Sequence, residues 1–400
     1  MGLIGIVAGA LACEAVVDVI VHAPDGPHPG WDVVWSGDRI QAVGPHAAPA
    51  GCTTHAVPGG QVTPGLIATG TRLGLIEVDQ EGGTHDGAGE GDPVRAALNV
   101  ADVYNPWTIV VPVVRLGGVT AATIHPTGGF VTGQAGAVRL HGTTVEQTVL
   151  ARRIGVGVDF NALGGASAGL LRLRELLADA RHYTSTGARW EGLDVLTASR
   201  LDLEALADVV AGRLPLLVGV DRAGEIDAVL RLAEAERVRV VLFGGAEAWM
   251  LADRLAAARV AVVVDPLVYG PGSFDQLHAR PDNAAILARA GVDVILGAGG
   301  THNARALRFV AGNAVRGGMT HEQALAAITA TPARVFGLAG RGALTVGAVA
   351  DLVVWTGDPL DIPGRLHTLV IGGDVIPQVS RQTELVDAWR ELPSWPLRAP

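Results

Sequence analysis

Two acidic residues and an arginine follow apolar segments that we predict as strands. Asp221 and Arg222 come directly after LPLLVGV, and Asp265 follows VAVVV. A carboxylate pair at strand ends does acid and base work when burial raises the pKa of one partner. The alternative is that these carboxylates and Arg222 form ion pairs that cap the loops. Both alternatives stay open from the sequence alone.

Two histidines stand in similar places. His302 lies in GGTHNAR after VILGA, and His125 follows VTAATI. Histidine changes charge near neutral pH, so His302 is a candidate base. In the alternative interpretation Thr301 caps the following helix and His302 packs in a loop, and the same caution applies to His125. The glycine-rich segment 297–303 resembles an anion cradle but lacks the Lys and Ser/Thr of a phosphate loop.

Strands alternate with amphipathic helices from about residue 66 to 338. The segments predicted as strands are GLIATGTRLGL, VTAATIHP, GAVRLHG, VGVDFN, LPLLVGV, RVVLFGG, VAVVVDP and VDVILGAGG. Repeated strand and helix units favour a parallel sheet, and eight parallel strands predict a closed (β/α)8 barrel. Barrel enzymes carry their chemistry at the carboxyl ends of the strands, where Asp221, Arg222 and Asp265 are predicted to lie.

Short strands and turns occupy both ends of the chain. The pattern of residues 1–65 returns in residues 339–378, so we predict one small β-sandwich built from both ends. It flanks the barrel of residues 66–338. A C-terminal helix and tail fill residues 379–400.

The composition bounds the function. The chain is 49% hydrophobic and 18% charged, which is enough to bury a large core. The net charge of −10 and the lack of a basic run exclude a nucleic-acid partner. The sequence contains no lysine, which excludes a lysine Schiff base and a carbamylated-lysine metal bridge. No stretch reaches the ~20 apolar residues of a transmembrane segment.

The two cysteines and the N-terminal segment bear on the compartment. Cys13 and Cys52 are too few for a disulfide framework, and we expect them to be buried or incidental, with a disulfide between them as the alternative. Residues 1–13 have the apolar length of a signal segment but lack its positive start. A cysteine after ALA is typical of an envelope lipoprotein, and a buried N-terminal strand is the alternative. A cytoplasmic location is favoured.

Four motifs resemble the amidohydrolase superfamily, and specifically its imidazolonepropionase-like branch, over nearly the full chain. The motifs are GDRIQAVG (37–44), VTPGLI (62–67), NARALRFVAGNAVRGGMTHEQALAAITATPARVFGL (303–338) and GALTVGAVADLVVWTGDPL (342–360). The resemblance implies a metal-bearing (β/α)8 barrel with a composite β-sandwich. It also implies an amidohydrolase activity, which breaks C–N bonds.

The metal ligands that the resemblance implies are absent. The family has Asp-Ala-His-x-His where this chain has ATGTR, then a histidine after each of the fifth and sixth strands and an aspartate after the eighth. The matching ligand positions are Gly70, Arg72, Gly219, Gly244 and Gly300. A catalytic zinc needs about three protein ligands, and glycine has no side chain. We therefore expect a degenerate metal site, no transition metal and no cofactor.

Arg72 stands where a ligand histidine would point into the barrel mouth. We predict that it points there and contacts at least one of Glu77, Asp221 or Asp265, because an enclosed guanidinium without a partner costs several kcal/mol. One alternative is a bidentate grip on a carboxylate or phosphate of a ligand. The other is a purely structural ion pair.

Three classes of function stay open. The first is a non-catalytic amidohydrolase-like protein that binds a small molecule or serves as an assembly subunit. The second is a hydrolase that acts on an amide or cyclic amide without a metal, and the third is an ordinary metal-dependent hydrolase with misplaced ligands. We expect a small anionic or amide ligand, and a homo-oligomer stays open. The predicted ligand-binding residues are Arg72, Glu77, Arg222 and His302, and the candidate catalytic residues are Asp221, Asp265 and His302.

Overall fold

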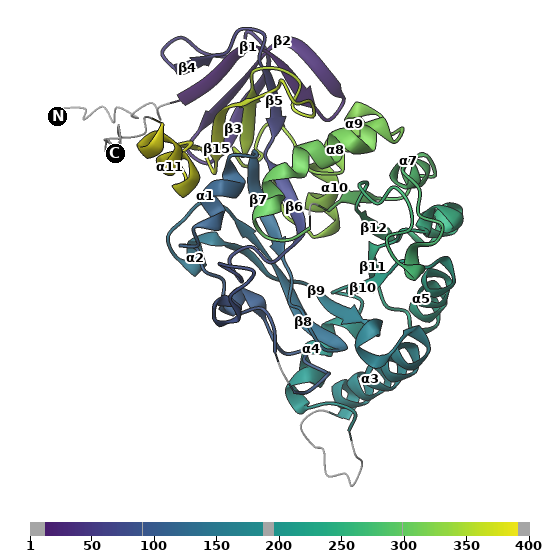
Figure 1. Ribbon diagram of the computed structural model, residues 1–400. Helices are drawn as coiled ribbons and strands as arrows, with labels where there is room; N and C mark the ends of the chain where they lie inside the picture. Colours follow the sequence, from purple (N-terminus) through teal and green to yellow (C-terminus); the bar gives the residue numbers. More distant parts are fainter. Residues whose placement is uncertain (1–12, 90, 187–195, 298, 391–400) are drawn as a thin grey trace, which may run out of the picture.

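A computed structural model describes residues 13–89, 91–186, 196–297 and 299–390 of the 400-residue chain (Figure 1). Its strands form two sheets of eight strands each. The first sheet, which we call the barrel sheet, contains β6 (Leu66–Thr71), β7 (Val119–Ile124), β8 (Val131–Arg139), β9 (Val149–Asp159), β10 (Leu216–Val220), β11 (Val240–Gly244), β12 (Ala261–Val264) and β13 (Val294–Leu296).

The barrel sheet is mixed rather than parallel. Its strands follow one another in chain order from β6 to β13, and each predicted strand coincides with one of them. The prediction that all eight run parallel is wrong, because β8 is antiparallel to both β7 and β9. Only residues 125–130 join β7 to β8, whereas a parallel crossover needs a dozen or more residues. The fold is therefore a mixed α/β fold with a nearly closed eight-stranded barrel.

The two edge strands of the barrel sheet are bridged by a loop. The Leu296 N–H of β13 donates to the Ala327 carbonyl over 3.1 Å, and the Ile67 N–H of β6 donates to the Ile328 carbonyl over 2.8 Å. Residues 327–328 thus satisfy backbone groups on both edges, which explains how the barrel nearly closes without a β6–β13 ladder.

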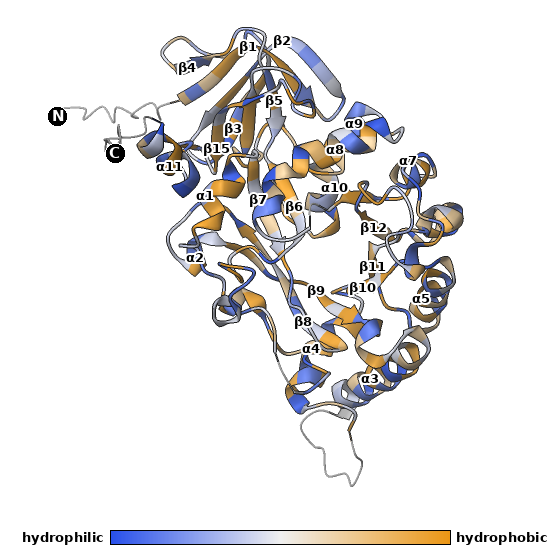
Figure 2. Ribbon diagram, viewed as in Figure 1, coloured by the Kyte–Doolittle hydropathy of each residue, from blue (hydrophilic) through white to orange (hydrophobic). Residues whose placement is uncertain are grey.

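Helices cover the outer face of the barrel sheet (Figure 1). The α-helices are α1 (Val110–Arg115), α2 (Val145–Thr148), α3 (Ala166–Thr186), α4 (Arg200–Val210), α5 (Ala223–Glu236), α6 (Ala252–Ala258), α7 (Asn283–Arg289), α8 (Leu307–Arg316), α9 (His321–Ala326), α10 (Ala330–Val335) and α11 (Arg381–Trp389). The 3-10 turns are η1 (Gly82–Thr84), η2 (Val100–Asp102), η3 (Phe160–Leu163), η4 (Ala248–Leu251), η5 (Phe274–Gln276) and η6 (His302–Ala306). The helices show mixed hydrophobic and hydrophilic surfaces, and β2 (Gly26–Ser36) of the second sheet is largely hydrophilic (Figure 2).

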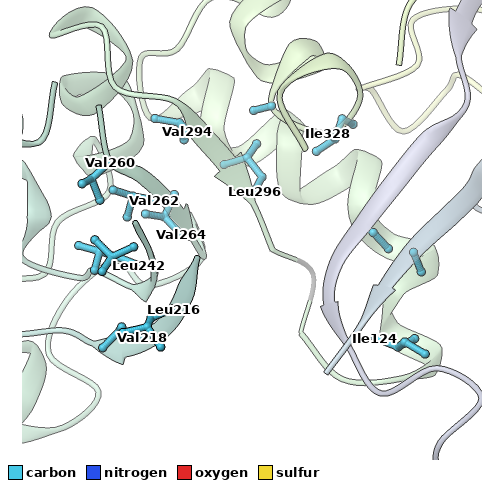
Figure 3. Packing of buried hydrophobic residues seen from close by; sticks show 14 of the residues in the cluster. Ile124, Leu216, Val218, Leu242, Val260, Val262, Val264, Val294, Leu296 and Ile328 are labelled. Carbon is cyan, nitrogen blue, oxygen red and sulfur yellow. The ribbon is translucent and has the colours of Figure 1, made fainter. Parts of the chain in front are cut away.

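Both faces of the barrel strands are buried. Leu216 and Val218 of β10 pack with helix residues in the outer core, part of which Figure 3 shows. Leu217, between them, packs with Val241 and Val263 in the inner core. Successive side chains of a strand point to opposite faces, so a strand buried on both faces is a continuous apolar run. This is why the sequence shows these strands so clearly.

Strands from both ends of the chain share the second sheet, which we call the end sheet. Its order is β16-β15-β14-β5-β1-β2-β3, and β4 pairs with β1. The strands are β1 (Cys13–Ala23), β2 (Gly26–Ser36), β3 (Arg39–Pro45), β4 (Thr53–Ala56), β5 (Gln61–Pro64), β14 (Leu352–Trp355), β15 (Leu366–Ile371) and β16 (Asp374–Ile376). Antiparallel pairing of β5 with β14 joins the two ends. The description of this sheet as a sandwich, and the domain bounds at residues 65, 338 and 378, stay predictions.

The cysteines form a disulfide, so the expectation of buried or incidental thiols is wrong. The Cα atoms of Cys13 and Cys52 lie 4.8 Å apart. The adjacent residues Glu14 and Thr53 are partners in the parallel pairing of β1 with β4, which brings the cysteines together. Disulfides are rare in reducing compartments, so this bond argues against the cytoplasmic location. In the lipoprotein alternative the Cys13 sulfur would carry a lipid, so it could not also form this disulfide.

Two predictions concern the ends of the chain. The proposed signal over residues 1–13 lies almost wholly outside the described residues. The predicted C-terminal helix is present as α11, and residues 391–400 also lie outside the described part. Among the described residues, no helix is long and apolar enough to cross a membrane.

Candidate functional site in the barrel mouth

A pocket of about 390 Å³ opens at the carboxyl ends of β7, β9, β10 and β11. We call it the mouth pocket. The polar side chains around it include His125, Asp159, Asp221, Glu225 and Asp275, and Phe243 supplies an aromatic wall. Each of the strands ends here, so residues far apart in the sequence meet in one place. This is the end of a barrel at which loops carry chemistry.

His125 is held in place by β6 and β7. Its Nε2 lies 2.9 Å from the Thr123 hydroxyl, which also accepts the Gly70 N–H over 3.0 Å. Its backbone N–H donates to the Thr71 carbonyl. Thr123 is fully buried, so its hydroxyl proton needs an acceptor, and Nε2 provides one. This arrangement leaves the ring proton on Nδ1, for which the described residues supply no partner.

Burial keeps the His125 ring uncharged. Removal from water lowers the pKa of His125 to about 4. The ring of Phe243 lies against it, with the ring centres 5.0 Å apart and the planes tilted by 59°. At neutral pH the imidazole is therefore a neutral hydrogen-bond donor in an aromatic setting. It suits the polarisation of a ligand carbonyl better than the binding of an anion.

Asp221 is an anchored carboxylate on the same pocket. Its Oδ1 accepts the Ala246 N–H and its Oδ2 accepts an Nε2 hydrogen of Gln276, both over 3.0 Å. Each carboxylate oxygen has a second lone pair, so Asp221 can still accept a proton or a hydrogen bond from a ligand. Asp221 is the one predicted catalytic residue that lines the pocket, and its role stays a prediction.

An ion-pair cluster lies beside Asp221. Arg222 is half exposed and donates to Glu225 Oε1 from Nη2 over 2.6 Å, and its Nε lies 3.5 Å from Asp275. Glu225 raises the pKa of Arg222 through this hydrogen bond. The loop-capping alternative thus describes Arg222 better than ligand binding does. Glu225 and Asp275, which the sequence did not single out, line the pocket.

The other predicted residues lie elsewhere. Asp265 accepts the Leu267 N–H and closes a turn, and it does not line the mouth pocket. His302 is exposed in η6 and also lies outside the lining. Thr301 occupies the position before η6 but makes no capping hydrogen bond. Glu77 accepts hydrogen bonds from Asn105 and Thr108, which suits a structural anchor for the loop after β6.

Arg72 does not make the contact that we predicted. Its Nη2 lies 3.8 Å from Asp79, and the described residues show no ion pair to Glu77, Asp221 or Asp265. Gly70 has φ +76°, which breaks the two-residue period of β6 just before Arg72. The predicted contact assumed an unbroken strand through residue 72. The pair is about 40% exposed on both sides, so it contributes little to stability.

The metal positions of the family do not fit a metal here. A Cβ at Gly244 would lie 2.6 Å from Asp221 Oδ1, and one at Gly70 would lie 3.3 Å from the Phe243 ring. Gly70, Gly244 and Gly300 have φ values of +76°, +95° and +71°, in the left-handed region that favours glycine. The backbone thus matches glycine at these places, and restoring a ligand would strain it. No group of three His, Cys, Asp or Glu suited to a metal occurs among the residues that the structure describes.

His125 was noted in the sequence but was not predicted as a site residue. It follows an apolar strand just as Asp221 does, and the caution against a lone histidine set it aside. Arg95, in the loop after β6, carried no sequence signal.

Comparisons with known proteins agree with this architecture. The model of a family described as Amidohydrolase family matches residues 220–376. A 71-residue segment is 49% identical to the N-acyl-D-glutamate deacylase of Alcaligenes xylosoxydans xylosoxydans, covering 15% of this chain and 14% of that protein. The match thus spans a small part of the curated relative.

Solved structures resemble the chain over most of its length. An amidohydrolase from Thermotoga maritima MSB8 is 24% identical with a TM-score of 0.82, covering 91% of this chain and 99% of that one. A molinate hydrolase is 17% identical with a TM-score of 0.58, covering 92% and 95%. At these identities the likeness shows the fold. The family match itself is confined to residues 220–376.

Proposed function

We propose that this protein hydrolyses a C–N bond of a small amide bound in the mouth pocket. The observation that carries this proposal is the pairing of a neutral imidazole, His125, with an anchored carboxylate, Asp221, around one pocket at the carboxyl ends of the strands. Amide hydrolysis needs a donor to the carbonyl oxygen and an acceptor for a proton of the attacking water. This pocket offers one of each.

The steps follow from these two groups. The Nδ1–H of His125 donates to the amide carbonyl oxygen and stabilises the negative charge that develops there. Asp221 accepts a proton as a water oxygen bonds to the carbonyl carbon. The C–N bond then breaks, the proton passes from Asp221 to the leaving nitrogen, and a carboxylic acid and an amine are released.

A second candidate function is binding without turnover, in a non-catalytic or assembly subunit. The specific observation in its favour is the set of four glycines and one arginine where the resemblance places metal ligands. Loss of the metal site, and the imidazolonepropionase-like branch, belong to this proposal as well. The same pocket serves both candidates, so turnover distinguishes them.

The choice of substrates follows from the relatives. The name N-acyl-D-glutamate deacylase makes N-acyl amino acids of both hands the first substrates to test. Cyclic amides are the second set, because the imidazolonepropionase-like resemblance implies them. We expect small substrates, since the pocket holds about 390 Å³.

The test is release of free amine or ring-opened product by the purified protein, with and without a strong chelator. We expect turnover that the chelator leaves unchanged and that Asp221→Asn and His125→Gln each reduce by about 100-fold or more. His302→Gln is the matched control, since His302 is exposed and lies outside the pocket. Absence of turnover with every substrate would favour binding alone. Turnover that the chelator abolishes would mean that the metal ligands were misplaced.

A further inference from the structure

We propose that Arg95 is an anion receptor at the rim of the mouth pocket, and that it binds the carboxylate of an amide ligand. The inference deepens the proposed function and rests on it for the identity of the pocket. It concerns the substrate class and requires no turnover. Four observations carry it: the place of Arg95, its glycine surroundings, its two unpaired nitrogens and the acidic lining of the pocket.

Arg95 lies directly behind the rim of the pocket. Its backbone N–H donates to the Val131 carbonyl over 3.0 Å, at the start of β8. The turn that joins β7 to β8 includes Thr127 and Gly128, which line the pocket. A Cβ at Gly128 would lie 3.2 Å from Arg95 Nη2. Only a residue without a side chain therefore separates this nitrogen from the pocket.

Three glycines make room for the guanidinium. A Cβ at Gly129 would lie 2.4 Å from Nη2, and a Cβ at Gly89 would lie 2.4 Å from Nη1. Gly128 and Gly129 also have φ values of +80° and +73°. Two loops thus pack against the guanidinium through backbone alone, which fixes its position without neutralising it.

Two nitrogens of the guanidinium lack a partner among the described residues. Its Nε and Nη1 are buried without a hydrogen bond. Of the other arginines in the described part of the chain, Arg115 has one such nitrogen, its Nε. A buried charge without a partner destabilises the folded state, and a bound anion would remove that penalty. This makes Arg95 a ligand contact rather than a structural one.

The acidic lining of the pocket selects the kind of anion. Asp159, Asp221, Glu225 and Asp275 all line the pocket. They would repel a phosphate dianion more strongly than a carboxylate, and they accept hydrogen bonds from an N–H group. A planar guanidinium also matches a carboxylate with two parallel hydrogen bonds. The fitting ligand therefore has a carboxylate at one end and an amide N–H toward the other.

The test is calorimetric titration of the whole protein with N-acetylalanine, N-acetylalaninamide and inorganic phosphate. We expect N-acetylalanine to bind at least tenfold more tightly than the other two. Arg95→Met should abolish that preference, and Arg95→Lys should restore part of it. The control is Arg239→Gln, which changes an exposed arginine at the opposite end of the barrel. This variant should keep the preference for N-acetylalanine.

A second measurement separates ligand binding from a structural role. Without ligand, Arg95→Met should unfold at the same or higher denaturant concentration than the wild type, because it removes an unpaired buried charge. A clear loss of stability would mean that Arg95 supports the fold and would overturn the proposal. The proposal is also overturned if no probe binds, if phosphate binds most tightly, or if Arg95→Met keeps the preference for the carboxylate.

The results that would contradict the proposed hydrolase differ from those that would contradict the Arg95 receptor. If N-acetylalanine binds through Arg95 but no amide is hydrolysed, the receptor stands and the hydrolase proposal falls. If amides are hydrolysed with equal rates whether or not they carry a carboxylate, the hydrolase stands and the receptor falls.

Discussion

Both ends of the barrel have arginines beside a pocket, but these arginines differ in whether a carboxylate of the protein pairs with them. At the amino end, a pocket of about 720 Å³ is lined by Arg239, Arg254, Arg259 and Arg334 together with Glu234 and Asp293. Two of these arginines have carboxylate partners: Arg334 binds Asp293 with both Nη atoms, and Arg254 pairs with Asp227. At the carboxyl end, Arg95 has no carboxylate partner among the described residues.

This difference shows which pocket is built for a ligand. The larger pocket lies where helices α5 and α6 end, and arginines at helix carboxyl ends offset the helix dipole. Of the two arginines without a described carboxylate partner, Arg259 is the C-cap of α6 and Arg239 donates to the Arg213 carbonyl. The smaller mouth pocket has an imidazole nitrogen that no described residue engages, and two guanidinium nitrogens without a described partner lie behind its rim. Unfilled hydrogen-bonding capacity, rather than volume, distinguishes the candidate site.

Removing one carboxylate at each end should give the largest contrast. Asp221→Asn keeps the size of the side chain but loses the proton acceptor, so turnover should fall by about 100-fold to 10,000-fold. Asp293→Asn removes half of a partly exposed ion pair and should leave turnover unchanged. Steady-state kinetics on both variants measure this. Equal losses would mean that the two ends do not differ in function.

Filling each pocket is the next contrast. A Cβ at Gly219 meets its nearest atom at 3.9 Å, so Gly219→Trp has room to project into the mouth pocket. It should weaken ligand binding by about 100-fold because a buried ligand must make close contacts. Ala257→Trp, in the amino-end pocket, should leave binding intact. Titration calorimetry with N-acetylalanine measures both effects. A larger effect of Ala257→Trp would mean that the ligand does not bind in the mouth pocket.

The pH dependence of the free energy of unfolding tests the lowered pKa of His125. Its folded pKa of about 4 lies below the ~6.5 of an unfolded histidine. Protonation therefore favours the unfolded chain. The stability that neutral His125 contributes is fully present above about pH 6.5 and is lost as the pH falls toward 4. The loss amounts to at most about 3 to 4 kcal/mol, at ~1.4 kcal/mol per pKa unit. Urea unfolding at pH 7 and pH 4.5 should show this slope in His302→Gln but a smaller one in His125→Gln.

The smallest expected effect concerns the ion pair at the amino end. Arg334→Gln breaks the pair with Asp293, whose side chains are 60% and 40% exposed. Exposed pairs contribute about 0.2 to 1 kcal/mol, so the free energy of unfolding should change by no more than that. Chemical denaturation checks this. A loss of several kcal/mol would mean that this ion pair stabilises the fold far more than an exposed pair should.

The sequence predicted the strands better than the site. Each barrel strand was visible because both of its faces are buried, which produces continuous apolar runs. The direction of β8 was missed, since an apolar run looks the same in either direction, and the predicted strand began several residues after the observed β8 does, which hid the short connection at 125–130. The disulfide depended on the pairing of β1 with β4, and no spacing rule connects Cys13 to Cys52.

The site depended on contacts between distant segments. Asp221 was selected because it directly follows a strand. Arg72 was misjudged because the positive φ of Gly70 interrupts the alternation of β6. Arg95 owes its importance to partners that it lacks and to glycines in two other loops, and such a relation appears only when the chain is folded.

A crystal structure of the protein with bound N-acetylalanine tests the central claim most directly. We predict the ligand in the mouth pocket, with its carboxylate at ~2.9 Å from the guanidinium of Arg95, its carbonyl oxygen facing His125 Nδ1 and its amide toward Asp221. Ligand found in the amino-end pocket, or in the mouth pocket with its carboxylate turned away from Arg95, would contradict the account.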